Sequence, residues 1–207
     1  MKFRLGSRFG KARGVWLIAG ALWIGASVSG LALLAIYDNS PTGNQQAPPH
    51  WPTASHIVLS EPGATLILFA HPRCPCTRAS LGELEKIVAD CRGSVTPWVV
   101  FFKPAGSQDD WEQTDLLKTA AAIPGAHVVR DLDGEEARRF HAMISGQTLL
   151  YSNQGDLLFS GGITFARGHS GDNDGRTAIE SYLTGGTQGS RHTPVFGCPI
   201  AVRQEQK

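Results

Sequence analysis

Two cysteines separated by one proline, Cys74 and Cys76, are the residues with the clearest chemical potential in this chain. They follow a short apolar run, ATLILFA at 64–70, and precede residues 77–90, where apolar side chains recur at helical spacing. The pattern predicts a buried strand, a tight turn holding both thiols, and a helix. A helix N-terminus stabilises a thiolate through its free N–H groups and its dipole. We therefore expect one thiol to attack disulfides and the other to release the mixed disulfide.

Charged and titratable residues flank this turn. Arg73 and Arg78 are expected to favour a thiolate, and Cys74, which precedes the helix, is expected to be the more exposed and reactive thiol. His71 lies three residues before Cys74. A histidine there suits proton transfer near neutral pH, although a surface position without a role is an equal alternative.

Strand and helix patterns alternate along the chain and predict an α/β fold with a mixed central sheet covered by helices on both faces. The expected strands are 64–70, 95–102, 127–130, 147–151 and 157–160, and the expected helices are 77–90, 111–122, 134–143 and 176–183.

The last two expected strands flank Asn153-Gln154-Gly155, a compact hairpin signal. An antiparallel second strand runs back toward the end of the sheet where Cys74 lies. The polar, glycine-rich loop 161–175 is therefore expected to cover the thiols, with His169 as a second candidate for proton transfer. An ordinary surface loop is the alternative.

The segment LILFAHPRCPCTRASLGELEKIV resembles the active-site region of the thioredoxin-like superfamily, and ISGQTLLYSNQGDLLFSGGI resembles the late hairpin of that family. The resemblance covers residues 64–183. It implies a thioredoxin-like fold and thiol–disulfide exchange, with Cys74, Cys76, His71 and His169 as the catalytic candidates. The HPRCPCTRAS block and the late VFGCP are also similar to membrane-anchored bacterial redox proteins labelled RedB.

The chain departs from the family pattern at two points. The family spacing is C-x-x-C, whereas this chain has C-x-C, whose disulfide closes a small, strained and more oxidising ring. The family's cis-proline, which shapes the substrate groove and keeps metals off the thiols, falls on Gln147, before Thr148. By this resemblance Arg73, Gln147 and Thr148 are the expected substrate-binding residues.

Two further cysteines lie outside this motif. Cys91 ends the helix that Cys76 begins, so about 22 Å separates them and they cannot pair. The last helix runs away from the thiol end and delivers the tail toward Cys91, which favours a structural disulfide between Cys91 and Cys198. In the alternative, the 14 residues after Leu183 curl back and make Cys198 a resolving thiol.

The N-terminal part predicts a membrane anchor. Residues 15–37 carry no charge, and a helix of that length covers about 34 Å, enough to span a bilayer. A cleaved signal peptide is the alternative, but its apolar region is usually shorter. The predicted organisation is a basic cytoplasmic tail (1–14), an anchor (15–37), an extended linker (38–52), a thioredoxin-like domain (53–185) and a tail (186–207).

The distribution of charge supports a cytoplasmic N-terminus. Five of the 19 basic residues lie in the first 13 positions, which places the domain on the periplasmic or outer side of the cytoplasmic membrane. The remaining residues hold 14 basic and 18 acidic side chains, so a nucleic-acid partner gets no support. The expected partners are extracytoplasmic protein thiols or disulfides, and the expected chemistry needs no cofactor.

Three other functions fit the same residues less well. Thiolates bind Cu(I), so Cys74, Cys76 and His169, with His71, form an alternative copper site in a metal-handling module. A cysteine peroxidase is weaker, because that family requires T-x-x-C and His71 occupies the threonine position. A binding domain with purely structural thiols is the remaining alternative.

Overall fold

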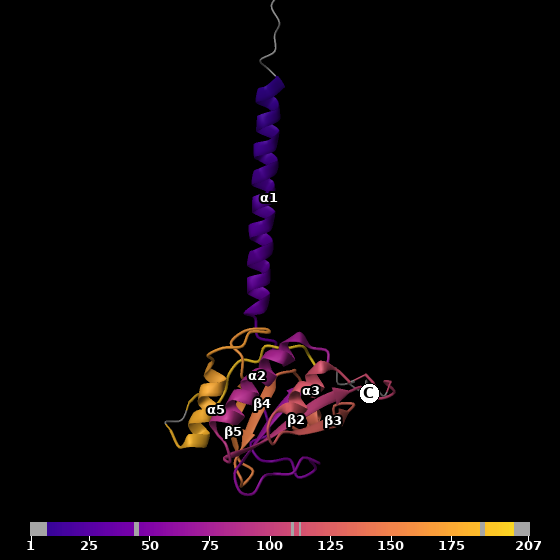
Figure 1. The fold of residues 1–207 in the computed structure, drawn as a ribbon, viewed down its shortest axis with the longest axis vertical. Helices are drawn as coiled ribbons and strands as arrows, with labels where there is room; N and C mark the ends of the chain where they lie inside the picture. The colour runs from indigo at the N-terminus through magenta and orange to yellow at the C-terminus, as the bar shows by residue number, and fades with distance from the viewer. Residues whose placement is uncertain (1–7, 44–45, 109, 112, 187–188, 201–207) are drawn as a thin grey trace, which may run out of the picture. The chain divides into compact units, whose positions relative to one another are not determined.

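The computed structural model describes residues 8–43, 46–108, 110–111, 113–186 and 189–200 (Figure 1). The chain forms two compact units, Met1–Asp38 and Asn39–Lys207. The first half of the predicted basic tail, residues 1–7, and the end of the predicted C-terminal tail, residues 201–207, lie outside the described residues.

The first unit is one long helix, α1 (Arg8–Asp38). Its portion Gly14–Asp38 has a mean hydropathy of 2.0. At 1.5 Å per residue these 25 residues cover about 37 Å. The side chains described along it are apolar all round and exposed, so α1 fits a single-pass membrane anchor.

The second unit contains a five-stranded mixed sheet in the order β3-β2-β1-β4-β5. Strands β1 (Ala64–Ala70), β2 (Val95–Lys103) and β3 (His127–Leu132) are parallel. Strands β4 (Gln147–Tyr151) and β5 (Leu157–Gly162) form an antiparallel hairpin, and β4 pairs antiparallel with β1. The fully buried β1 lies at the centre of the sheet, as its continuous apolar sequence predicts.

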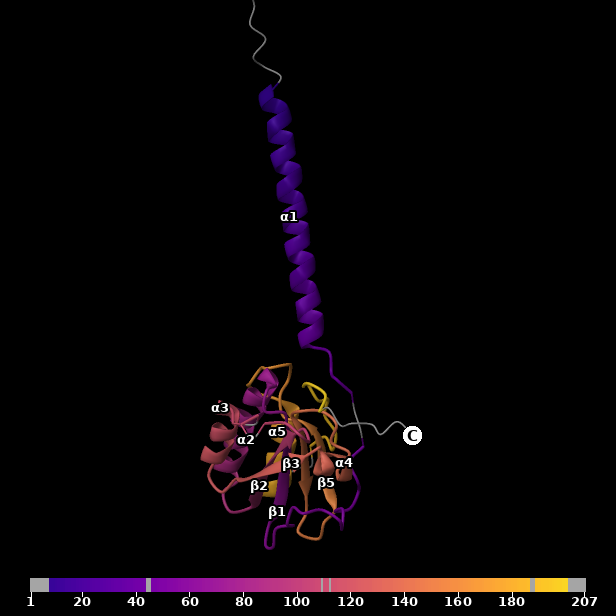
Figure 2. The ribbon, with the colours of Figure 1, turned by 90° about the vertical axis from the view of Figure 1, so that its right-hand side faces the viewer.

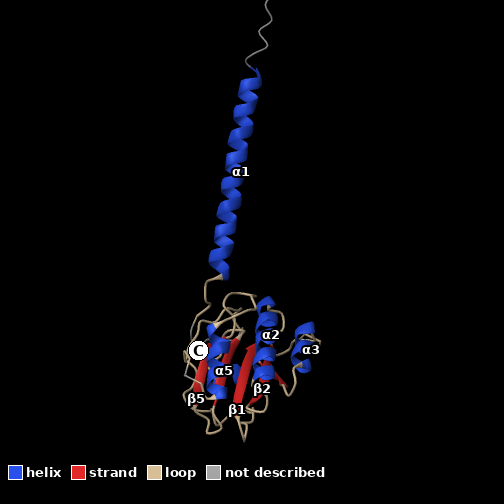
Figure 3. Cartoon of the chain, turned by 60° about the vertical axis from the view of Figure 1, so that its left-hand side comes forward, coloured by secondary structure: helices blue, strands red, loops and turns tan. Residues whose placement is uncertain are grey.

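Helices cover both faces of the sheet, as predicted. Helices α2 (Pro75–Asp90), α3 (Asp115–Ala122) and α5 (Asp174–Thr184) pack on one face, around a core that includes Leu68, Leu84 and Ile179 (Figure 3). The short α4 (Glu135–Arg139) lies on the other face, which Figure 2 shows beside the sheet. Phe69 and Phe140 belong to the core there.

The segment after α1 differs from its prediction as an extended linker. Trp51 packs edge-on against Phe140 and Tyr151, with ring centroids 5.2 Å apart in each pair. The carbonyls of Pro48 and Pro49 accept hydrogen bonds from the Tyr151 hydroxyl and the Leu157 N–H. This polar, proline-rich stretch is therefore part of the folded unit, because it covers the sheet face that α4 leaves open.

The tail after α5 also belongs to this unit. Ser160 N–H donates to the Arg191 carbonyl, and His192 pairs in parallel with Ser160 of β5. A Cβ on Gly161 would meet the Thr193 side chain at 2.2 Å, so only glycine permits this approach. The tail consequently runs along β5 toward the end of the sheet where β1 leads into α2.

Candidate functional site

Cys74 is the N-cap residue of α2, with Pro75 in the first turn. Its N–H donates to the His71 carbonyl at 3.1 Å, and its own carbonyl accepts from the Thr77 N–H at 3.1 Å. These two bonds form the tight turn between β1 and α2. The turn places the Cys74 thiol beside the free N–H groups of a 16-residue helix, as the sequence predicts.

The thiol next to Cys74 comes from the tail. Cys198 Sγ lies 2.9 Å from Cys74 Sγ, and the two thiols share a hydrogen bond. The predicted Cys91–Cys198 disulfide is therefore wrong. Cys91 caps the other end of α2, about 25 Å along the helix from Cys74, and all four cysteines are free thiols in this structure. The error arose because the tail reverses direction after α5.

The electrostatics of this thiol pair are asymmetric. Burial alone would raise the pKa of Cys74, but hydrogen bonds from Cys198 and from the N–H groups of Cys76 and Thr77 outweigh it and lower that pKa. Burial and the hydrogen bond to Cys74 raise the pKa of Cys198 to about 12. Cys74 is thus the thiol of the pair that ionises first, and Cys198 then keeps its proton and donates to the Cys74 sulfur.

Cys76 faces the loop 161–175. The Gly168 N–H binds its sulfur, and the Arg167 charge acts on it. Burial, the charge of Cys74 and a hydrogen bond to Cys74 nevertheless raise the pKa of Cys76. The prediction that this loop covers the thiols is confirmed for Cys76.

The prediction about exposure is wrong for Cys74. Its exposed fraction is 1%, against 9% for Cys76, because the arm that carries Cys198 covers it. Its lowered pKa still makes it the stronger candidate nucleophile of the two.

Parallel β1, β2 and β3, an antiparallel β4–β5 hairpin, and two cysteines where β1 enters α2 together decide the fold. The fold is thioredoxin-like. A hypothetical protein from Sinorhizobium meliloti matches with a TM-score of 0.59 and 20% identity, over 78% of this chain and 97% of its own. An uncharacterized conserved protein from Geobacillus kaustophilus matches with a TM-score of 0.57 and 20% identity, over 79% and 93%.

A secreted disulfide oxidoreductase from Mycobacterium tuberculosis matches with a TM-score of 0.41 and 14% identity, over 59% of this chain and 81% of its own. No protein-family model and no curated protein sequence matches this chain.

In this thioredoxin-like domain, His71 shapes the active-site turn. Its Nδ1 accepts from the Arg73 N–H at 3.1 Å, and its ring packs against Phe102 and Trp111. Burial and the Arg73 charge lower the pKa of His71, so the ring is neutral at pH 7. A proton-transfer role for His71 stays a prediction.

The two arginines of the turn have partners other than the thiols. The Arg73 guanidinium lies 4.9 Å from the centre of the Trp111 ring and donates to the Trp111 carbonyl. Arg78 pairs with Asp115 at the start of α3. Hydrogen bonds, and not these two charges, therefore lower the pKa of Cys74.

The predicted substrate-binding residues Gln147 and Thr148 are both buried. Gln147 donates to the His141 carbonyl at 3.4 Å, and the Thr148 hydroxyl donates to the Gly146 carbonyl at 3.2 Å. This placement does not support direct contact with a substrate. Of the three predicted residues, only Arg73 is exposed beside the thiols.

His169 lies in the covering loop but is turned toward its own neighbours. Its Nδ1 contacts the Arg167 carbonyl at 2.6 Å, and its ring lies 5.6 Å from the Phe165 ring. Cys198, and not His169, makes the direct contact with Cys74, and a proton-transfer role for His169 stays a prediction. Within the described ranges, no group of three or more His, Cys, Asp or Glu side chains is placed to hold a metal ion, so the predicted copper ligands are not assembled.

Two residues of the site escaped the sequence analysis. Arg167 donates to the Gly197 carbonyl at 2.8 Å and to the Thr42 hydroxyl at 2.7 Å, and its charge acts on both Cys76 and Cys198. Thr42 in turn binds the tail. Arg167 could have been found from the sequence, because it is a basic residue in the glycine-rich loop expected to cover the thiols. Thr42 lies in the segment predicted to be a linker, and no sequence signal marked it.

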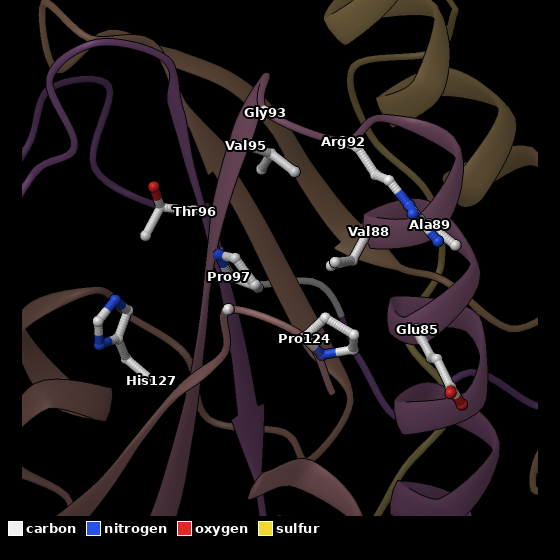
Figure 4. Close-up of a pocket in the computed structure, with 11 residues that line it drawn as sticks. Glu85, Val88, Ala89, Arg92, Gly93, Val95, Thr96, Pro97, Pro124 and His127 are labelled. Carbon is white, nitrogen blue, oxygen red and sulfur yellow. The ribbon is translucent and has the colours of Figure 1, made fainter. Parts of the chain in front are cut away.

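A separate cavity of about 550 Å³ lies at the other end of α2 (Figure 4). Glu85 of α2 and Arg92, just after α2, line one side, and His127 at the start of β3 lines the other. None of its lining residues is a cysteine. The cavity therefore lies at the opposite end of α2 from Cys74 and Cys76.

Proposed function

We propose that this protein is a membrane-anchored thiol–disulfide oxidoreductase that acts outside the cytoplasm, with Cys74 as its nucleophile. The observation that carries the proposal is the Cys74 thiol at the N-terminus of α2, which accepts hydrogen bonds from the Cys198 thiol and from two helix N–H groups. A thiolate stabilised in this way attacks disulfides near neutral pH.

The neighbouring thiols support the same function. Cys76 and Cys198 both have raised pKa values, so they stay protonated while Cys74 ionises. One ionised thiol beside protonated ones is the arrangement that thiol–disulfide exchange requires, because a thiolate must attack and a second thiol must complete the reaction. The partners would be protein thiols or disulfides on the same side of the membrane.

The orientation of the anchor determines the compartment in which the proposed oxidoreductase would act. Basic residues before α1 favour a cytoplasmic N-terminus, which leaves the second unit on the periplasmic or outer side of the cytoplasmic membrane. Thiols in that compartment take part in disulfide exchange, since it is oxidising.

Equilibration with graded mixtures of reduced and oxidised glutathione tests the proposal. Full-length protein in detergent is quenched with an alkylating reagent, and its free thiols are counted by intact mass. The wild type and Cys91→Ser should show one reversible two-electron transition, and Cys74→Ala should lose it. A transition that survives Cys74→Ala would overturn the proposal.

Metal analysis of protein purified without chelators addresses the copper alternative. Stoichiometric copper that is lost in both Cys74→Ser and Cys76→Ser would favour the metal-handling module over the oxidoreductase.

A further inference from the structure

We infer that Cys198, carried by the C-terminal arm 195–200, is a catalytic residue that resolves mixed disulfides at Cys74 in place of Cys76. The inference rests on the proposed function and names the second thiol of its reaction. Three observations support it: the hydrogen bonds that hold the arm, the close approach that Gly197 permits, and the different charges of the Cys74 and Cys198 sulfurs.

The arm is docked as a strand beside the residues that precede β4. Ser145 N–H donates to the Cys198 carbonyl at 2.9 Å, and Ile200 N–H donates to the Met143 carbonyl at 2.8 Å. Ile144 and Pro199 form the antiparallel bridge between these bonds. The backbone on both sides of Cys198 is thus fixed by hydrogen bonds to the domain.

The same segment is tied to the active-site turn. The Ser145 hydroxyl accepts from the His71 N–H at 2.9 Å and exchanges a 2.9 Å hydrogen bond with the Thr77 hydroxyl. Both residues belong to the turn and helix that hold Cys74. Ser145 therefore connects the two cysteines: its N–H holds the backbone of Cys198, and its hydroxyl holds the turn that carries Cys74.

The other side of the arm is held by Arg167 and Thr42. Arg167 donates to the Gly197 carbonyl at 2.8 Å, and the Thr42 hydroxyl donates to the same carbonyl at 2.6 Å. Thr42 N–H donates to the Val195 carbonyl at 2.9 Å. These bonds, together with those of Ser145, fix the arm on two sides directly before Cys198.

Gly197 is the residue that lets the arm approach so closely. A Cβ at this position would meet the Ser145 carbonyl oxygen at 1.8 Å, a distance that no side chain tolerates. The clash is with backbone, so no rotamer change relieves it. The sequence Gly197-Cys198 is thus fitted to this contact.

The proposed reaction follows from the resting charges. The Cys74 thiolate attacks a partner disulfide, forms a mixed disulfide through Cys74 Sγ, and releases one partner sulfur as a thiolate. That step removes the negative charge and the hydrogen bond that hold the Cys198 proton. Cys198 then gives its proton to the released thiolate or to solvent.

The Cys198 thiolate next attacks Cys74 Sγ. A Cys74–Cys198 disulfide forms, the bond to the partner breaks, and the second partner sulfur leaves as a thiolate that takes a proton from solvent. Two electrons have moved from the protein dithiol to the partner disulfide, and the reverse sequence oxidises a partner dithiol. The two sulfurs already lie 2.9 Å apart, so bond formation at about 2.05 Å needs a movement of less than about 1 Å.

Cys76 is less suited to this step. A Cys74–Cys76 disulfide closes a ring across the single residue Pro75, which strains the bond. The Cys76 sulfur is also held by the Gly168 N–H in the covering loop. The attack on Cys74 therefore does not need Cys76.

Reaction with dithiobis(nitrobenzoate) in a Cys91→Ser background distinguishes the two resolving thiols. Cys91→Ser with Cys76→Ser should release two nitrothiobenzoate ions in succession and keep no adduct. Cys91→Ser with Cys198→Ser should release the first ion and hold the adduct on Cys74, with a lifetime longer by at least about tenfold. The opposite pattern, an adduct trapped by loss of Cys76 and resolved without Cys198, would overturn the inference.

Gly197→Ala tests the arm without removing a thiol. The added methyl group should displace the arm and slow release of the second ion by about tenfold. Gly82→Ala is the matched control, because a Cβ there meets only the Ser170 hydroxyl oxygen at 3.8 Å. An unchanged second phase in Gly197→Ala would contradict the inference.

Different results would overturn the role of Cys198 and the proposed function. If Cys76 resolves the adduct, exchange at Cys74 still stands and only the role of Cys198 falls. If Cys74→Ala still exchanges with glutathione, the proposed function itself falls.

Discussion

The Thr42 hydroxyl donates a 2.6 Å hydrogen bond to the Gly197 carbonyl, so the segment that follows α1 holds the arm that carries Cys198. Thr42 lies only four residues after Asp38, the last residue of α1. Its hydroxyl also accepts from Arg167 at 2.7 Å. The segment directly after α1 is thus part of the thiol site and not a passive tether.

Thr42→Val should loosen the arm. The change removes the hydrogen bond to Gly197 and the acceptor for Arg167, a loss of about 1 kcal/mol that raises the undocked population about fivefold. Hydrogen–deuterium exchange at the N–H groups of Ser145 and Ile200 measures it in the reduced full-length protein. Thr53→Val, at an exposed position, is the control. Equal protection of the two N–H groups in both variants would show that Thr42 does not hold the arm.

The pH dependence of Cys74 alkylation follows from its lowered pKa. Only the thiolate reacts, so the rate with iodoacetamide rises as pH passes through the pKa, and its midpoint should lie below the ordinary cysteine value of about 8.5. Cys198→Ala removes the side-chain hydrogen bond that lowers this pKa, so the midpoint should move to higher pH. The rate is followed by peptide mapping. A midpoint that stays in place or falls in Cys198→Ala would contradict the assigned donor.

Glu83→Gln should destabilise the fold and loosen the loop that covers Cys76. Glu83 is fully buried in α2, where it accepts from Lys86 at 2.8 Å and from the Gly171 N–H at 2.9 Å. Losing its charge weakens these bonds, which should cost about 1–3 kcal/mol in the free energy of unfolding. Urea denaturation measures this cost.

Glu85→Gln is the matched control for Glu83→Gln, because Glu85 lies on the same helix with an exposed side chain. Equal stability of the two variants would count against the proposed tie between α2 and the loop.

The sheet was predictable because its signals are local. The bounds of β1 and β4 match the sequence prediction, since each is a continuous run whose residues are all buried. The predicted helix 134–143 is shorter in the structure, and α4 ends at Arg139. His141 adopts a φ of 53°, which a continuing α-helix excludes.

The errors concern contacts between distant segments. Proline and polar residues around Trp51 suggested a free linker, and no local pattern shows that this ring packs on Phe140. The path of the tail likewise depends on Gly161, which admits Thr193 against β5. Cys198 therefore reaches Cys74 through contacts that the Cys-Pro-Cys motif itself does not encode.

The anchor hypothesis predicts that the full-length chain stays with membranes after carbonate extraction. The apolar helix Gly14–Asp38 should keep it there, because its apolar side chains lose their favourable lipid contacts on release. A reporter fused after Asn39 should be active only outside the cytoplasm. A processed N-terminus within residues 25–45, or release of the chain by carbonate, would contradict the anchor.

Disulfide mapping of the oxidised full-length protein tests the central claim most directly. Protein oxidised with glutathione in detergent is alkylated, digested without reduction, and analysed by mass spectrometry. The account predicts one cross-linked peptide pair that joins Cys74 to Cys198, with Cys76 and Cys91 alkylated. A Cys74–Cys76 disulfide with Cys198 alkylated, or a Cys91–Cys198 pair, would contradict it.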